Sequence, residues 1–178
     1  AMISSLAAKT LIHSTAKLAT TTFMGYRGND VLDGGDGNDR IVGGLGDDTI
    51  SGGAGNDYIL AQTGNDTISS GTGNDEIDAG LGNDAITVNG AGNKTIDGGS
   101  GTDRVNISIS GITSMDSFSS VHRDTSTGYL SLTSQSGDVI SIKNIEQLYV
   151  NDLDYGDASS SNPSGFSNVS NLFYNSSV

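Results

Sequence analysis

The sequence has no cysteine, no tryptophan and only one proline, and aromatic residues make up 6% of its 178 residues. Without cysteine there is no disulfide framework and no thiolate metal site. With so few aromatic side chains, a conventional large hydrophobic core is not expected. No apolar run approaches the roughly 18 residues that a membrane span requires, so no transmembrane segment is expected either.

Basic residues are scarce as well. Lys and Arg number 8 against 21 Asp and Glu, which gives a formal net charge of -13. This excess of negative charge would repel phosphates, so nucleic acid is not expected as a partner and cations are favoured. The only histidines are His13 and His122, and neither lies in a recognisable nucleophile or metalloprotease motif. We therefore predict no enzymatic activity.

Glycine is abundant, with 26 residues, and most of it follows a repeat of nine. Nine copies and one extra residue, Val88, occupy residues 25–106. Position four is always Gly, position eight is always Leu, Ile or Val, and position six is Asp in every copy except the one with Lys94. The glycine content excludes a helix, so the period itself must be structural.

Each copy divides into a loop and a short strand. Positions one to six are rich in Gly and Asn, which suit a loop with positive φ angles, and positions seven to nine suit a strand of three residues. Two copies would form one coil of 18 residues. Coils stacked at roughly 4.8 Å would enclose the position-eight side chains between two parallel sheets.

In such a stack the negatively charged aspartates require positive charges between them. Aspartates at the same end of successive coils would lie within about 5 Å of one another. Ca²⁺ suits them best, because it accepts about six to eight oxygen ligands from carboxylates and backbone carbonyls. Zinc would require His or Cys, and neither occurs in the repeats.

These copies resemble the calcium-binding nonapeptide of the repeats-in-toxin (RTX) family, G-G-x-G-x-D-x-U-x with U a large aliphatic residue. The resemblance implies an all-β fold, a right-handed parallel β-roll or β-solenoid. It also implies that each Ca²⁺ lies between two loops on the same edge, bound by aspartates and loop carbonyls.

Applied copy by copy, the resemblance gives about six inter-loop ions on two edges. Four lie on one edge, between Asp30, Asp48, Asp66, Asp84 and Asp103. Two lie on the other edge, between Asp39, Asp57 and Asp75. The expected carbonyl ligands are those of Gly28, Gly35, Gly37, Gly44, Gly46, Gly53, Gly55, Gly64, Gly73 and Gly82. A further site at Lys94 is left open, because an ammonium would occupy the place of the cation, and Val88 beside it suggests a disturbed roll.

The segments around the repeats are expected to be caps and a tail. Residues 1–24 are predicted to form a cap, with an amphipathic helix over 3–19, and residues 107–157 a C-terminal β cap. Within that β cap, Leu130 and Leu132 should face Ile140 and Ile142 in a hairpin. The acidic cluster Asp152, Asp154 and Asp157 could hold another ion. Residues 158–178 are expected to form a flexible tail, and their composition is similar to that of type I secretion signals.

The function expected from the resemblance is that of a calcium-binding module in a larger secreted bacterial protein, at the cell surface or outside it. The chain would be disordered without Ca²⁺ and would fold outside the cell, after export by the type I secretion machinery. Two alternatives remain open at this point. One is an adhesin domain that binds a glycan, ice or another surface ligand through hydroxyls such as Thr49, Thr67 and Thr87, and the other is a surface-layer segment.

Overall fold

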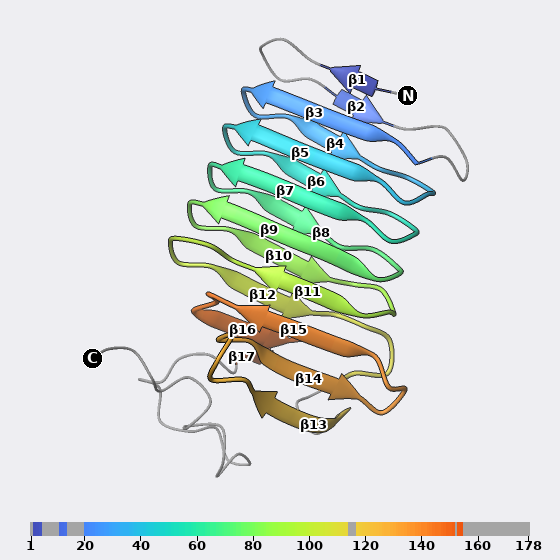
Figure 1. Ribbon diagram of the computed structural model, residues 1–178, viewed down its shortest axis with the longest axis vertical. Helices are drawn as coiled ribbons and strands as arrows, with labels where there is room; N and C mark the ends of the chain where they lie inside the picture. Colours follow the sequence, from blue (N-terminus) through green and yellow to red (C-terminus); the bar gives the residue numbers. More distant parts are fainter. Residues whose placement is uncertain (1, 5–10, 14–19, 114–116, 152, 155–178) are drawn as a thin grey trace.

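The computed structural model describes residues 2–4, 11–13, 20–113, 117–151 and 153–154. In this part of the chain the regular elements are all β-strands, and no helix is present that could span a membrane. The chain crosses back and forth between two sheets while it advances along one axis (Figure 1). The fold is thus a parallel β-solenoid of about five turns, as the periodicity predicts.

Each sheet is built from alternate strands of the chain. The first sheet has the spatial order β1 (Met2–Ser4), β3 (Thr22–Arg27), β5 (Arg40–Leu45), β7 (Tyr58–Thr63), β9 (Asp75–Leu81), β11 (Lys94–Asp97), β15 (Val139–Lys143), β14 (Leu130–Ser134), β13 (Phe118–Arg123). The second has the order β17 (Leu153–Asp154), β16 (Gln147–Val150), β12 (Arg104–Ile107), β10 (Ala85–Val88), β8 (Thr67–Ser69), β6 (Thr49–Ser51), β4 (Val31–Asp33), β2 (Leu11–His13).

The strands of the repeats pair in parallel at a constant offset of one coil. In the second sheet, for example, Ile50 pairs with Leu32 on one side and with Ile68 on the other. This register places equivalent positions of successive coils directly above one another. A side chain at a given repeat position therefore forms a row along the solenoid axis.

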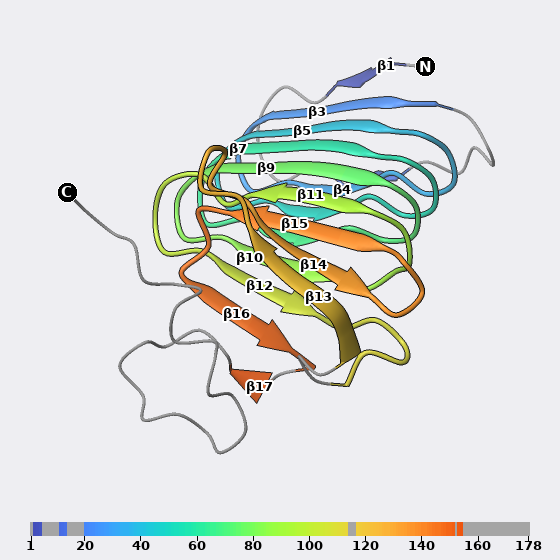
Figure 2. The ribbon, with the colours of Figure 1, turned by 60° about the horizontal axis from the view of Figure 1, so that its bottom comes forward.

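The core is a narrow layer between the two sheets, which face each other across the solenoid (Figure 2). The nine position-eight side chains lie in this layer and are at most 1% exposed: Leu32, Ile41, Ile50, Ile59, Ile68, Ile77, Ile86, Ile96 and Val105. Phe23 extends the row at one end and Leu148 at the other, and both are fully buried. The prediction that position eight forms the core is confirmed.

The two edges of the solenoid are not equivalent. Strands β4, β6 and β8 have three residues each, as predicted, whereas β5 and β7 have six. The longer strands continue into positions one to three of the following copy. As a result only residues 46–48 separate β5 from β6, whereas residues 52–57 separate β6 from β7.

The predicted N-terminal helix is wrong where the structure describes this segment. Met2–Ser4 is strand β1 and pairs in parallel with β3, and Leu11–His13 is strand β2 and pairs in parallel with β4. The partners are 20 residues apart, as in Ile3 with Phe23 and Ile12 with Leu32. These two strands therefore continue the two sheets. Residues 5–10 and 14–19 of the predicted helix lie outside the described part of the chain.

The extra residue Val88 does not disturb the roll, contrary to expectation. It lengthens β10 to four residues, and its side chain is fully buried. The pairing of β11 with β9 and of β12 with β10 remains parallel, with Lys94 opposite Asp75 and Arg104 opposite Ala85. The insertion only changes the spacing of the next rung from 18 to 19 residues.

The predicted C-terminal hairpin is confirmed. Strands β14 and β15 are antiparallel, with Leu130 opposite Ile142 and Leu132 opposite Ile140. Strand β15 then pairs in parallel with β11, and β16 in parallel with β12, so the chain returns to both sheets. Strand β13 adds a further antiparallel strand at the end of the first sheet.

Candidate functional site

The eight position-six aspartates lie along the two edges of the solenoid, directly before a strand or, for Asp75, at its first residue. Each is at most 4% exposed: Asp30, Asp39, Asp48, Asp57, Asp66, Asp75, Asp84 and Asp103. Carboxylates are among the groups most costly to bury, unless they are paired or bind a metal. Two rows of buried acids are therefore the feature of this fold that needs a chemical explanation.

One oxygen of each carboxylate links neighbouring coils. Oδ1 of Asp48 accepts the backbone N–H of Asp30 at 2.8 Å, and Oδ1 of Asp66 accepts that of Asp48 at 2.7 Å. The other edge repeats the pattern, with Oδ1 of Asp57 accepting the N–H of Asp39 at 2.8 Å. Hydrogen bonds from a backbone N–H to a carboxylate are charge-assisted and strong. These contacts therefore fix the position of each loop along the solenoid axis.

In six of the eight aspartates the second oxygen has no such partner. Oδ2 is buried and accepts no hydrogen bond in six of these residues: Asp39, Asp48, Asp57, Asp66, Asp84 and Asp103. An unsatisfied buried polar atom is rare in a native protein, and a charged one is more costly than a neutral one. A repeated row of such oxygens, all at the same repeat position, fits a row of bound cations.

Burial also changes the acidity of the row. It is the main cause that raises the pKa of Asp48, Asp57 and Asp103 to about 6, and that of Asp66 to about 7. For Asp66 the neighbouring charges of Asp48 and Asp84 add to the effect. The negative charges therefore destabilise one another and favour either protons or metal ions between them.

The carboxylates alone do not complete a metal site. Among the described residues, no three His, Cys, Asp or Glu side chains gather in one place. The loops also offer backbone carbonyls, which Ca²⁺ accepts readily. At position two, the carbonyls of Gly35 and Gly53 already accept the N–H groups of Ala54 and Thr72, at 2.7 and 2.8 Å. The position-four carbonyls are the better candidates.

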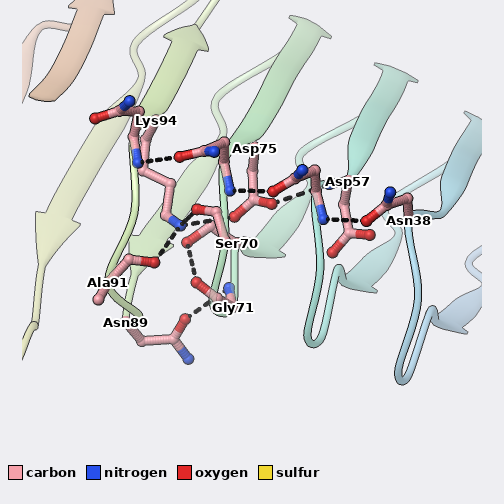
Figure 3. A network of polar contacts seen from close by, with 12 residues as sticks. Asn38, Asp57, Ser70, Gly71, Asp75, Asn89, Ala91 and Lys94 are labelled. Atoms are coloured by element: carbon pink, nitrogen blue, oxygen red, sulfur yellow. Dashed lines mark hydrogen bonds and ion pairs between the residues drawn. The ribbon is translucent and has the colours of Figure 1, made fainter. Parts of the chain in front are cut away.

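Lys94 shows what a cation in this environment contacts (Figure 3). Its side chain occupies the position-six place and is 1% exposed. Its ammonium group contacts Oδ2 of Asp75 at 2.8 Å, the position-four carbonyl of Gly73, and the position-three carbonyl of Ala91 at 3.2 Å. The position-six carboxylate of Asp75 and the position-four carbonyl of Gly73 thus converge on one positive charge.

A second polar ladder, which we did not predict, runs beside the aspartates at position five. Oδ1 of Asn38 accepts the N–H of Asn56, and Oδ1 of Asn56 accepts that of Asn74, both at 2.8 Å. The direction is opposite to that of the aspartate ladder. The signal was present in the sequence, because position five is Asn in seven of the nine copies.

Glu146 is the other residue that the sequence analysis missed. Its Oε2 accepts the backbone N–H of Asp103 at 2.8 Å, so it continues the ladder of Asp84 and Asp103 by one rung. The repeat pattern could not reveal it, because 43 residues separate it from Asp103. A signal was nevertheless available: Glu146 precedes the strand with Leu148 as position six precedes position eight.

The comparisons with known proteins agree with this geometry. The family model of the RTX calcium-binding nonapeptide repeat, in four copies, matches residues 20–50, 51–86 and 90–106. These repeats belong to the RTX calcium-binding nonapeptide repeat family. No curated protein matches the chain. The RTX repeats of this chain form a calcium-binding β-roll, and this family is typically a non-catalytic module.

The hydroxyl residues form two short rows on the second sheet. Thr49 pairs with Thr67, but the next residue in that row is Ala85. Thr87 lies in the neighbouring row, opposite Ser69. No observation beyond this short array favours a glycan- or ice-binding surface. The acidic cluster of Asp152, Asp154 and Asp157 lies outside the residues whose side chains are described.

The raised pKa values predict that protons, like calcium, stabilise the folded aspartate ladders. A folded-state pKa of about 6 to 7, above the ordinary value of 3.8, means that the folded roll binds protons more tightly than the unfolded chain. In calcium-free buffer, stability should therefore increase as the pH falls from about 7 toward 4. Protonation favours the calcium-free roll over the unfolded chain, whose carboxylates remain ionised at pH 5.5, so folding at pH 5.5 should need no more calcium than at pH 7.5. Calcium titrations followed by circular dichroism at both values test this, and a folding midpoint that rises at pH 5.5 would contradict it.

Proposed function

We propose that this RTX β-roll is a folding module driven by calcium in a larger secreted bacterial protein. The observation that carries the proposal is the set of six buried Oδ2 atoms without a hydrogen-bond donor, which lie in two rows on the two edges. Without cations, folding would bury these charges unpaired, 18 or 19 residues apart along the chain and one coil apart in space. With cations between the loops, the same charges become ligands.

The ions would lie between successive loops of one edge. Each would take oxygens from the position-six aspartates and from position-four carbonyls such as those of Gly46, Gly55 and Gly64. The aspartate pairs provide four such places on the edge that begins with Asp30 and two on the edge that begins with Asp39. We therefore propose six inter-loop Ca²⁺ ions as the full set between aspartates.

Folding and ion binding would then be one cooperative process. Ions that bind the folded roll and not the unfolded chain stabilise it in proportion to the logarithm of their concentration. Sites of extracellular calcium modules typically have dissociation constants of about 10⁻⁴ to 10⁻³ M. Such sites would be empty in the cytosol and filled outside the cell. The acidic chain would remain unfolded for export and would fold on arrival.

The export route is part of this proposal. RTX repeats are typical of type I secreted bacterial proteins, and a route that passes an unfolded chain suits a module that folds only after export. The type I secretion machinery and the rest of the parent polypeptide are therefore the proposed partners, with the secreted or cell-surface location as the proposed destination. The calcium-loaded roll would stabilise the protein to which it is attached.

Native mass spectrometry of the whole chain, titrated with calcium, tests the ion count. We expect six ions that bind together over a narrow range of calcium concentration. Magnesium at the same concentrations should not replace them, because it is smaller and requires a near-octahedral site with several retained waters. A chain that binds no calcium at millimolar concentration, or that takes magnesium equally well, would contradict the proposal.

A further inference from the structure

Lys94 is the one basic residue at repeat position six, and it lies in the interior of the fold. Its strand β11 pairs with β9, which places Lys94 opposite Asp75, and with β15, which places it opposite Ile140. The residue is 1% exposed, and its side chain and that of Asp75 are both fully buried in their ion pair. A buried lysine requires a strong compensating environment, and the contacts of its ammonium group define that environment.

These contacts are oxygens of the kind that a hard metal ion would take. They are Oδ2 of Asp75, the carbonyl of Gly73 in the same loop, and the carbonyl of Ala91 in the adjacent loop (Figure 3). The coil before it offers the same set at Oδ2 of Asp57, the carbonyl of Gly55 and the carbonyl of Thr72. There Oδ2 accepts no hydrogen bond. The two places differ in whether the protein supplies its own positive charge.

The ladder of backbone contacts changes at the same rung. The N–H of Asp57 donates to Oδ1 of Asp75 at 3.0 Å, as elsewhere in the row. The N–H of Asp75 has no carboxylate to meet at Lys94 and donates to the backbone carbonyl of Asn93 at 2.9 Å. Beyond Lys94 the next residue in the row is Ile140, which is fully buried and whose side chain has no ligand atom. The row of acids on this edge therefore ends at Asp75.

We propose that the ammonium group of Lys94 takes the place of a metal ion between the loops of Asp75 and Lys94. It holds this pair of neighbouring loops, one rung of the solenoid, together without calcium. The inference rests on the proposed function in that the other rungs are taken to bind calcium. It assigns to this rung a latent site for a hard divalent cation, which becomes available when the lysine is replaced by the aspartate of the other copies. The presence of lysine at this position also explains how the row of acids can end next to the apolar residue Ile140. The ammonium group of Lys94 neutralises the last carboxylate, that of Asp75.

Three variants of the whole chain test this. Lys94→Asp restores the repeat consensus, and Lys94→Met removes the charge while keeping a long side chain. Lys143→Met is the matched control, because Lys143 pairs with Asp97 at 2.7 Å on the surface, with side chains 29% and 25% exposed. The measurements are the number of calcium ions bound at saturation, by native mass spectrometry, and the melting temperature of the calcium-loaded protein.

We expect Lys94→Asp to bind one calcium ion more than the wild type, and Lys143→Met to bind the same number as the wild type. We expect Lys94→Met to melt about 10 °C or more below the wild type, because a buried carboxylate loses its partner. Lys143→Met should melt within a few degrees of the wild type, since surface ion pairs contribute little. An unchanged ion count in a folded Lys94→Asp would overturn the proposal, as would a melting temperature of Lys94→Met equal to that of Lys143→Met.

The same set separates this inference from the proposed function. If the wild type binds no calcium at all, the proposed function fails, and the melting comparison of Lys94→Met with Lys143→Met still decides whether the ammonium group supports the rung. If the wild type binds its ions and Lys94→Asp gains none, the inference about Lys94 fails alone. If Lys94→Asp does not fold even at high calcium, the rung cannot accept a metal, and the inference fails as well.

Discussion

Asp66→Asn should remove at least one bound calcium ion and raise the calcium concentration needed for folding by roughly tenfold or more. Asp66 lies in the middle of its row, with Asp48 before it and Asp84 after it, and it is 1% exposed. The amide retains the oxygen that accepts the N–H of Asp48. It places an NH₂ group where a ligand oxygen is required, so the effect reports metal binding and not the loss of the ladder bond.

Asp36→Asn is the matched control, because it removes the same charge from a repeat loop at the exposed position three. Its ion count and folding midpoint should equal those of the wild type. Calcium titrations followed by circular dichroism, together with native mass spectrometry, measure both quantities. Equal midpoints for Asp66→Asn and Asp36→Asn would show that the buried carboxylates are not the ligands.

Gly55→Ala should lower the stability of the folded roll by about 2 to 5 kcal/mol, and it should do so without touching a charge. Gly55 has a φ of +129°, a conformation that residues with a side chain rarely adopt. A Cβ atom there would also overlap the carbonyl oxygen of Gly37 in the preceding coil. Because the coils are held at strand spacing by hydrogen bonds above and below, the loop cannot move aside without breaking the ladder.

Gly128→Ala separates the two causes. Gly128 also has a positive φ, of +80°, but a Cβ atom there would meet nothing within 4 Å. It should lose only the conformational part, about 1 to 2 kcal/mol. Urea unfolding in saturating calcium measures the difference. If both variants lost the same amount, close contact between the coils would not be the reason for glycine at position four.

The strictly periodic features of this chain could be predicted because each position of the repeat has one environment. Ile50 is buried and Asp48 lies at the edge for the same geometric reason in every coil, so nine copies provide nine observations of one site. The N-terminal strands were missed because that segment has no nonapeptide. Ile3, Ala7, Leu11 and Leu18 fit a helical spacing, whereas the coil that pairs Ile3 with Phe23 has 20 residues and no glycine marker.

The ends of the ladders could not be predicted from the sequence, for a different reason. Glu146 becomes a neighbour of Asp103 only because the chain first forms β13 and β14, which lie at the end of the first sheet, and then returns through β15 and β16 to pair with β11 and β12. The role of Lys94 was left open because charge alone does not show whether an ammonium group lies in the row or points to solvent. Its burial and its contact with Asp75 are properties of the folded coil.

If cations hold the acidic coils together, the β-structure of the whole chain should appear and disappear with calcium, and circular dichroism follows this. The far-ultraviolet spectrum is recorded at pH 7.5 in excess chelator, then after calcium is added to a few millimolar, and again after the chelator is restored. We predict a disordered spectrum, a β-sheet spectrum, and a return to disorder. A β-sheet spectrum of equal strength in the chelator would contradict the account.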